Sequence, residues 1–171
     1  AVWSYDLSLK RTSWGPAGMA ACRTLDVLMG ARDARALPAA LVVGGHTAMI
    51  TQASRSEARG GTRTPGLLTM AGTAAITLAA FRAVLKSQHE RARLLSLALL
   101  GGYAGEMLRA GVRVLRRPGA ENLQELVRAG VLGIMPLEGG MAAGTGAAGR
   151  AAALAAAWVF VRRLSRKGRV T

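Results

Sequence analysis

Two long runs without a charged side chain constrain the fold of this chain most. The first covers Leu37–Ala53 and the second Pro65–Phe81, and each is 17 residues long. A helix of that length is close to the shortest that crosses the hydrocarbon core of a bilayer. The polar segment Ser54–Gly61, which reads SRSEARGG, lies between them. The sequence therefore predicts two membrane-spanning helices joined by a polar loop at a membrane edge.

Four further apolar segments extend this pattern to an all-α, polytopic transmembrane bundle. Glycine and proline separate the segments, and many apolar residues are alanine or glycine, which let helices approach closely in lipid. We treat residues 1–171 as a single membrane domain. The six expected spans are Trp14–Gly30, Leu37–Ala53, Gly66–Leu85, Leu94–Val112, Leu126–Ala143 and Ala151–Val161.

The strong positive charge of the chain argues for a bilayer rather than for nucleic acid as its partner. The net charge is +14, but the cations form short clusters between apolar runs, and aromatic residues make up only 4%. Nucleic-acid binding needs a continuous basic face, with aromatic side chains on which bases stack. If Ser54–Gly61 is cytoplasmic and the spans alternate, about two thirds of the lysines and arginines fall on the cytoplasmic side, as the positive-inside rule requires.

The Ser54–Gly61 segment has the residue types of a metal and anion site. Its single carboxylate, Glu57, is the kind of oxygen ligand that Mg²⁺ prefers, often together with water and substrate phosphate. Arg55 and Arg59 could bind phosphate through the planar, two-point contact of a guanidinium. The alternative is that Glu57 is a solvated acid paired with these arginines, which then only mark the cytoplasmic side.

Charged and polar residues inside the expected spans are a second set of candidates. Arg23 and Asp26 are three residues apart, so they share a helix face and can pair, although Arg23 could instead face a central cavity. His46 either packs between helices or orients an acceptor molecule. Gln52 has the same two alternatives as His46, whereas Glu106 and Glu138 could line a cavity, and Cys22 is expected to be a buried small hydrophobe.

Three segments in order resemble the UbiA superfamily of intramembrane prenyltransferases, in particular an actinobacterial and cyanobacterial branch that includes EboC-like proteins. They are YDLSLKRTSWGPAGMAACRTLDVLMGA (Tyr5–Ala31), TAMITQASRSEARGG (Thr47–Gly61) and VRAGVLGIMPLEGGMAA (Val127–Ala143). The resemblance implies transfer of a prenyl group from a prenyl diphosphate to an aromatic or other lipophilic acceptor. It also implies dependence on Mg²⁺ and a place in the bacterial inner membrane, with the active-site loops facing the cytoplasm.

The resemblance also assigns roles to individual residues. Glu57 would be the metal ligand and, with Lys10, a catalytic residue. The expected substrate-binding residues are Tyr5, Arg11, Arg23, Arg55 and Arg59. The family has two acidic motifs, and this chain departs from the second, since Glu57 stands where relatives have several aspartates. The first motif would lie upstream, so we expect an N-terminally truncated part of a larger bundle that is inactive alone.

A non-catalytic membrane module that assists metabolite export or assembly is the alternative function. The sparse acidic motif favours it, and an acidic N-D-x-x-D motif upstream would favour the enzyme. A CDP-alcohol phosphotransferase is excluded, because its D-x-x-D-G-x-x-A-R run has no counterpart in this sequence.

Overall fold

The computed structural model describes residues 12–57, 62–86 and 90–167. These residues form six α-helices, one short 3₁₀ helix and no strand, which confirms the expected all-α class. The helices are α2 (Gly15–Ala31), α3 (Leu37–Glu57), α4 (Thr64–Leu85), α5 (Glu90–Arg116), α6 (Ala120–Gly144) and α7 (Ala148–Lys167), with the 3₁₀ helix η2 at Ala34–Ala36.

Proline and left-handed residues set several helix ends. α2 and α4 each have a proline in the first turn, where the missing N–H would have no helical partner. α2 ends at Ala31, and the next residue, Arg32, is a non-glycine residue with a φ of 52° whose backbone N–H donates to the carbonyl of Leu28 over 3.0 Å. Gly146, with a φ of 84°, provides the turn between α6 and α7.

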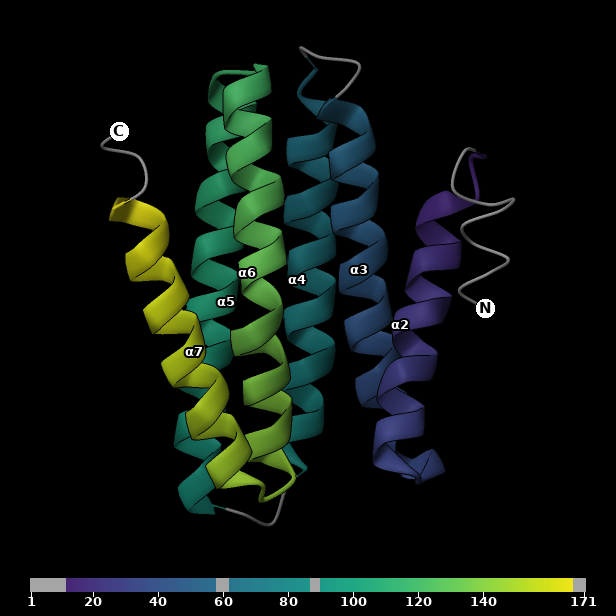
Figure 1. Ribbon diagram of the computed structural model, residues 1–171, viewed down its shortest axis with the longest axis vertical. Helices are drawn as coiled ribbons and strands as arrows, with labels where there is room; N and C mark the ends of the chain where they lie inside the picture. Colours follow the sequence, from purple (N-terminus) through teal and green to yellow (C-terminus); the bar gives the residue numbers. More distant parts are fainter. Residues whose placement is uncertain (1–11, 58–61, 87–89, 168–171) are drawn as a thin grey trace.

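Successive helices alternate in direction (Figure 1). α3, α4, α5 and α6 form a central group, with one flanking helix at each edge. α2 packs on α3 at one edge, and α7 packs on α6 and α5 at the other. This order places the start of α2, the end of α3 and the start of α4 at the same end of the bundle. The end of α5 and the start of α6 also lie at that end.

Glycine brings neighbouring helices into close contact at defined positions. A methyl group on Gly44 of α3 would overlap the Thr24 side chain and lie 3.1 Å from the backbone oxygen of Ala20 on α2. Between α4 and α5, a Cβ on Gly66 would lie 3.0 Å from the carbonyl oxygen of Gly111. These contacts are the close approach that the abundance of small residues predicts.

α4 buries two threonines and exposes several large apolar side chains, although Ile76 and Val84 are buried as well. Thr69 and Thr73 have exposures of 1% and 0%, whereas Leu67 and Leu78 are 58% and 52% exposed. The buried Thr73 hydroxyl donates to the sulfur of Met49. In water the exposure of several leucines on one helix is unfavourable, because burying leucine is favourable. This inverted burial is a property of the helix that its sequence alone does not show.

Two of the described helices, α4 and α6, are long and apolar enough to cross a membrane. Both correspond to expected spans, but the other expected spans, including Leu37–Ala53, do not meet the same measure of length and apolarity in the described residues. The expectation of a loop at Ser54–Gly61 was wrong for its first half, because α3 continues through Ser54, Arg55 and Ser56 to Glu57. Within this helical turn Ser54 is exposed, Arg55 donates to the backbone oxygen of Thr12 and Ser56 donates to the backbone oxygen of Gln52.

Candidate functional site

A cavity of about 500 Å³ lies at the end of the bundle where α2, α3 and α4 meet. α2 and the residues before it contribute Ser13, Trp14, Pro16 and Ala17. α3 and α4 provide the rest of the lining, which is Ala48, Met49, Gln52, Ala53, Ser56, Pro65, Leu68, Thr69 and Gly72. Most of the wall is apolar, and the hydroxyl and amide groups are few. The cavity can therefore hold an apolar group and offers a small number of polar contacts.

Arg55 joins the last turn of α3 to the segment that precedes α2. Its Nη1 donates a hydrogen bond to the backbone oxygen of Thr12 over 2.6 Å. The Thr12 hydroxyl accepts a hydrogen bond from the backbone N–H of Trp14 over 3.2 Å. A guanidinium has five N–H donors, so this contact leaves Arg55 with others for an anion near the cavity edge, where its neighbour Ser56 is part of the lining.

The other residues that the resemblance assigns to the site fall largely outside the described part of the chain. Tyr5, Lys10, Arg11 and Arg59 lie outside the described residues. Glu57 is the final residue of α3, and its side chain is likewise outside the description. The described part thus places Arg55 beside Thr12, the residue that directly follows Arg11 in the sequence. Ser13 and Trp14, which line the cavity, were not among the expected site residues.

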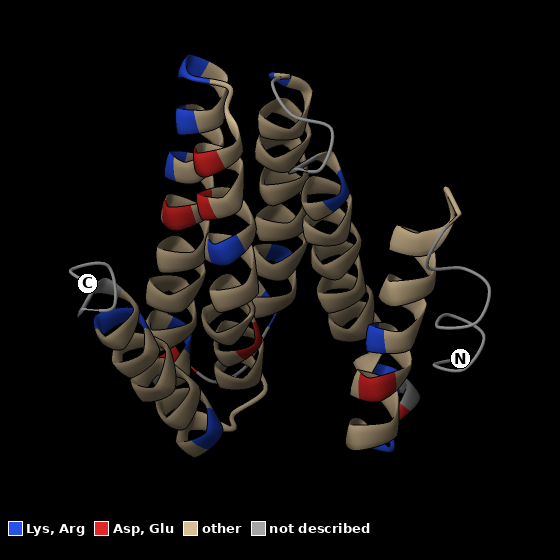
Figure 2. Ribbon diagram, turned by 45° about the horizontal axis from the view of Figure 1, so that its top comes forward, with Lys and Arg blue, Asp and Glu red and all other residues tan. Residues whose placement is uncertain are grey.

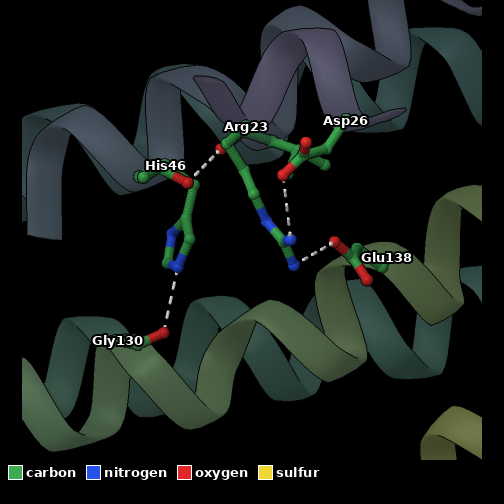
Figure 3. Close-up of polar contacts among 7 residues, drawn as sticks. Arg23, Asp26, His46, Gly130 and Glu138 are labelled. Carbon is green, nitrogen blue, oxygen red and sulfur yellow. Dashed lines mark hydrogen bonds and ion pairs between the residues drawn. The ribbon is translucent and has the colours of Figure 1, made fainter. Parts of the chain in front are cut away.

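Arg23 lies away from Arg55 and contacts two carboxylates (Figure 3). Its Nη2 is 3.4 Å from Oε1 of Glu138 on α6, and its Nη1 is 3.7 Å from Oδ2 of Asp26. The predicted Arg23–Asp26 pair is therefore confirmed, and Glu138 is a further partner from across the bundle. Arg23 is about 12 Å further along α2 than its first residue, at 1.5 Å of rise per residue. The structure does not bring Arg23 to the cavity where Arg55 lies.

His46 is buried between three helices and hydrogen-bonds on both ring nitrogens. Nε2 is 3.0 Å from the carbonyl oxygen of Gly130 on α6, and Nδ1 is 2.9 Å from the hydroxyl of Tyr103 on α5. Because a carbonyl can only accept, Nε2 of the neutral ring carries the proton and the Tyr103 hydroxyl donates to Nδ1. At 2% exposure His46 packs between helices, which is one of the two roles that its sequence position allows.

Two further carboxylates of the described helices are also paired with arginine on a neighbouring helix. Glu106 of α5 is 2.6 Å from Arg162 of α7, and Glu125 of α6 is 3.7 Å from Arg113 of α5. Among the described residues, no three or more histidine, cysteine, aspartate or glutamate side chains come together as a metal site.

Comparison of the chain with protein-family models, with curated proteins and with solved structures gave no match. The resemblance to UbiA prenyltransferases rests on the quoted sequence segments, and the site rests on its own geometry.

Proposed function

We propose that this chain is part of an integral-membrane prenyltransferase, in which the α2–α3–α4 cavity receives the prenyl group of a prenyl diphosphate. The observation that carries the proposal is the position of Arg55. Its guanidinium lies at the end of α3 and donates to the Thr12 backbone oxygen. Arg55 does not itself line the largely apolar cavity of about 500 Å³, but the residues next to it and to Thr12 in the sequence, Ser56 and Ser13, do. A cation next to an apolar cavity matches the two halves of a prenyl diphosphate, which are a charged head and a hydrocarbon tail.

The inverted burial of α4 supports the membrane part of the proposal. Only 28% of its most apolar window is buried, although a core helix of a water-soluble protein would be mostly buried. The large apolar side chains on its outer face match a lipid environment, and the threonines and glycines on its inner face match helix packing within a bilayer.

The residues present suggest a limited chemical role for the described part. Cleavage of the prenyl–oxygen bond leaves the bonding electrons on the diphosphate, whose added negative charge a guanidinium stabilises in the transition state. Arg55 is the described side chain placed for that role, and the apolar wall would shield the electron-poor prenyl group from water. Mg²⁺ dependence, with Glu57 as a ligand, belongs to the proposal through the resemblance, and no step is derived from it.

The test uses the full-length protein in membranes, a radiolabelled prenyl diphosphate and a lipid extract as the acceptor source. We expect label transfer that requires Mg²⁺ and that Glu57→Gln abolishes. Glu121→Gln is the matched control, because Glu121 is an exposed carboxylate in the first turn of α6 and does not line the cavity. Full turnover by Glu57→Gln would show that the site assignment is wrong.

A second readout does not depend on the acceptor. A non-hydrolysable farnesyl thiodiphosphate should raise the thermal unfolding midpoint of the detergent-solubilised protein, and Arg55→Gln should reduce that rise. Arg63→Gln, an exposed arginine just before α4, controls for the change of charge. An equal rise in all three proteins would contradict binding at Arg55.

A non-catalytic membrane module is the second candidate function. The pairing of Glu106, Glu125 and Glu138 with arginines favours it, because a carboxylate held by arginine contributes to helix association instead of binding a cation. In that case the protein would insert into membranes but would neither transfer the labelled prenyl group nor bind the thiodiphosphate.

A further inference from the structure

A second cavity, of about 690 Å³, lies between α5, α6 and α7, apart from the cavity at α2–α4. We name it the basic groove and define it by the five arginines that line it, which are Arg109, Arg113, Arg116, Arg128 and Arg162. Figure 2 shows basic and acidic positions interleaved near the end of α5 and the start of α6. The proposed prenyl transfer does not use this surface.

Helix periodicity gathers these charges on one face. On α5, Arg109, Arg113 and Arg116 follow one another at spacings of four and three residues, so they project from the same side of the helix. Arg128 of α6 and Arg162 of α7 complete the groove from the neighbouring helices. Three helices that are separate in sequence thus direct arginines into one cavity.

The groove keeps an excess of positive charge after its internal pairs are formed. Glu106 pairs with Arg162 and Glu125 pairs with Arg113, so the five arginines and two glutamates leave three positive charges. Within the described residues, Arg109 and Arg116 are exposed and have no carboxylate within ion-pair distance. Their guanidinium groups are therefore available to an anion from outside the chain.

Two arginines are held in position by the protein itself. Nη2 of Arg128 donates to the backbone oxygen of Ser165 over 3.0 Å, which connects α6 to α7. The guanidinium of Arg162 lies 5.5 Å from the centre of the Trp158 ring in addition to its pair with Glu106. The groove thus combines fixed arginines with free ones, which suits the several oxygens of a phosphate group.

The sequence pattern of the helices around the groove favours a lipid as the source of the phosphate. In the sequence, each of these helices has a run of at least eleven residues without lysine or arginine. Arg109 and Arg162 directly follow such a run, and Arg128 directly precedes one. All three arginines line the same cavity, so the segments without lysine or arginine end at a similar height along the three helices. Leu108, Val112 and Leu132 provide an apolar wall beside the arginines. Basic pockets of this kind between helices bind anionic lipid headgroups.

We propose that the basic groove binds the phosphate of an anionic phospholipid headgroup, with the acyl chains along the apolar wall. The lipid would occupy this site independently of prenyl transfer, so loss of lipid binding and loss of prenyl transfer can be measured separately. Free phosphate shares the headgroup chemistry but lacks the acyl chains, and this difference allows the two sources to be distinguished.

The experiment measures lipid retained by the full chain in nanodiscs of phosphatidylcholine with or without phosphatidylglycerol, by native mass spectrometry. We expect selective retention of phosphatidylglycerol that falls about tenfold or more in the Arg109→Gln/Arg116→Gln double variant, since each arginine near the surface adds to anionic-lipid binding. Arg82→Gln/Arg150→Gln removes the same charge from exposed positions outside the groove and should leave retention unchanged. Equal losses in the two double variants would overturn the proposal.

A gain-of-binding variant and a soluble competitor complete the test. Glu125→Gln frees Arg113 from its carboxylate partner and should increase phosphatidylglycerol retention several-fold, whereas Glu121→Gln, outside the groove, should not. Inorganic phosphate at millimolar concentration should fail to displace the lipid. Displacement by phosphate, or lower retention in Glu125→Gln, would show that the groove does not select an anionic lipid.

Discussion

At the scale of single residues, the inner polar groups of this bundle act in contacts between helices. His46 connects α3 to Tyr103 of α5 and to the Gly130 carbonyl of α6, and it has no access to solvent that would suit a general base. Arg23 similarly connects α2 to α6 through Glu138. The polar side chains that remain for chemistry are those at the helix ends, Arg55 foremost.

The Tyr103→Phe substitution tests the His46 contact. It removes the hydroxyl that donates to Nδ1 and leaves a buried ring nitrogen without a partner, which costs about 1–3 kcal/mol. We expect a lower thermal unfolding midpoint in detergent. The double variant His46→Leu/Tyr103→Phe should lose less than the sum of the two single losses, because both partners are then absent. Strictly additive losses would contradict the hydrogen bond.

Sequence reasoning could identify such pairs only when both partners were near each other in the chain. The Arg23–Asp26 contact follows from helix periodicity and was predicted. Glu138 is 115 residues from Arg23, so its contribution depends on how helices pack, which no local pattern gives. The arginines of the basic groove could be counted in advance as cytoplasmic charge. Their convergence on one cavity required the arrangement of α5, α6 and α7.

At the scale of helices, apolar runs predicted the positions of all six and the ends of α2 and α4 to within two residues, whereas other helices extend several residues beyond the predicted spans. α6 begins at Ala120, six residues before the expected start, because the polar Glu121 and Asn122 form its first turn after Gly119. α3 continues to Glu57, since nothing in Ser54–Glu57 breaks a helix. An apolar run marks only the part of a helix that faces lipid or core. Polar residues in the first and last turns are helical too, but an apolar run does not include them.

The adjacent glycines of α3 provide a matched test of helix contact. Gly44→Ala should destabilise the protein by about 1–3 kcal/mol, because the added methyl group meets Thr24 and the α2 backbone. Gly45→Ala should be neutral or stabilise by about 0.5–1 kcal/mol, since no atom lies within 4 Å and alanine favours the helix. Thermal unfolding of both variants measures the difference. Equal midpoints would contradict close packing of α2 on α3.

At the scale of the whole molecule, alternation of the helices predicts which connections share a side of a membrane. In the described residues, Arg63 and Arg117 lie in connections at one end of the bundle, and Lys86 and Thr145 lie in connections at the other end. The sequence analysis assumed that successive spans alternate, and the helix directions agree with that. The charge bias adds the prediction that the end with Arg63 and Arg117 is cytoplasmic. Whether α3, α5 and α7 cross a bilayer depends on neighbours that shield their charges, which hydropathy cannot evaluate.

Cysteine labelling tests this topology in intact cells. In a Cys22→Ala background, which removes the buried free thiol, single cysteines replace Arg63, Arg117, Lys86 or Thr145. A membrane-impermeant maleimide should modify Cys at positions 86 and 145 without permeabilisation, and at positions 63 and 117 only after it. Equal labelling of all four positions in intact cells would contradict a membrane-spanning bundle in this orientation.

The Arg23–Glu138 contact also has a consequence for biosynthesis. With synthesis at about 5–20 residues per second, roughly 6 to 23 seconds separate the appearance of Arg23 from that of its partner 115 residues later. During that interval Asp26, one turn away, is the carboxylate that can accompany the arginine. On the proposed membrane function, the α2–α3 hairpin would therefore enter the bilayer with its own provisional counter-charge and dock in its final position only after α6 has emerged.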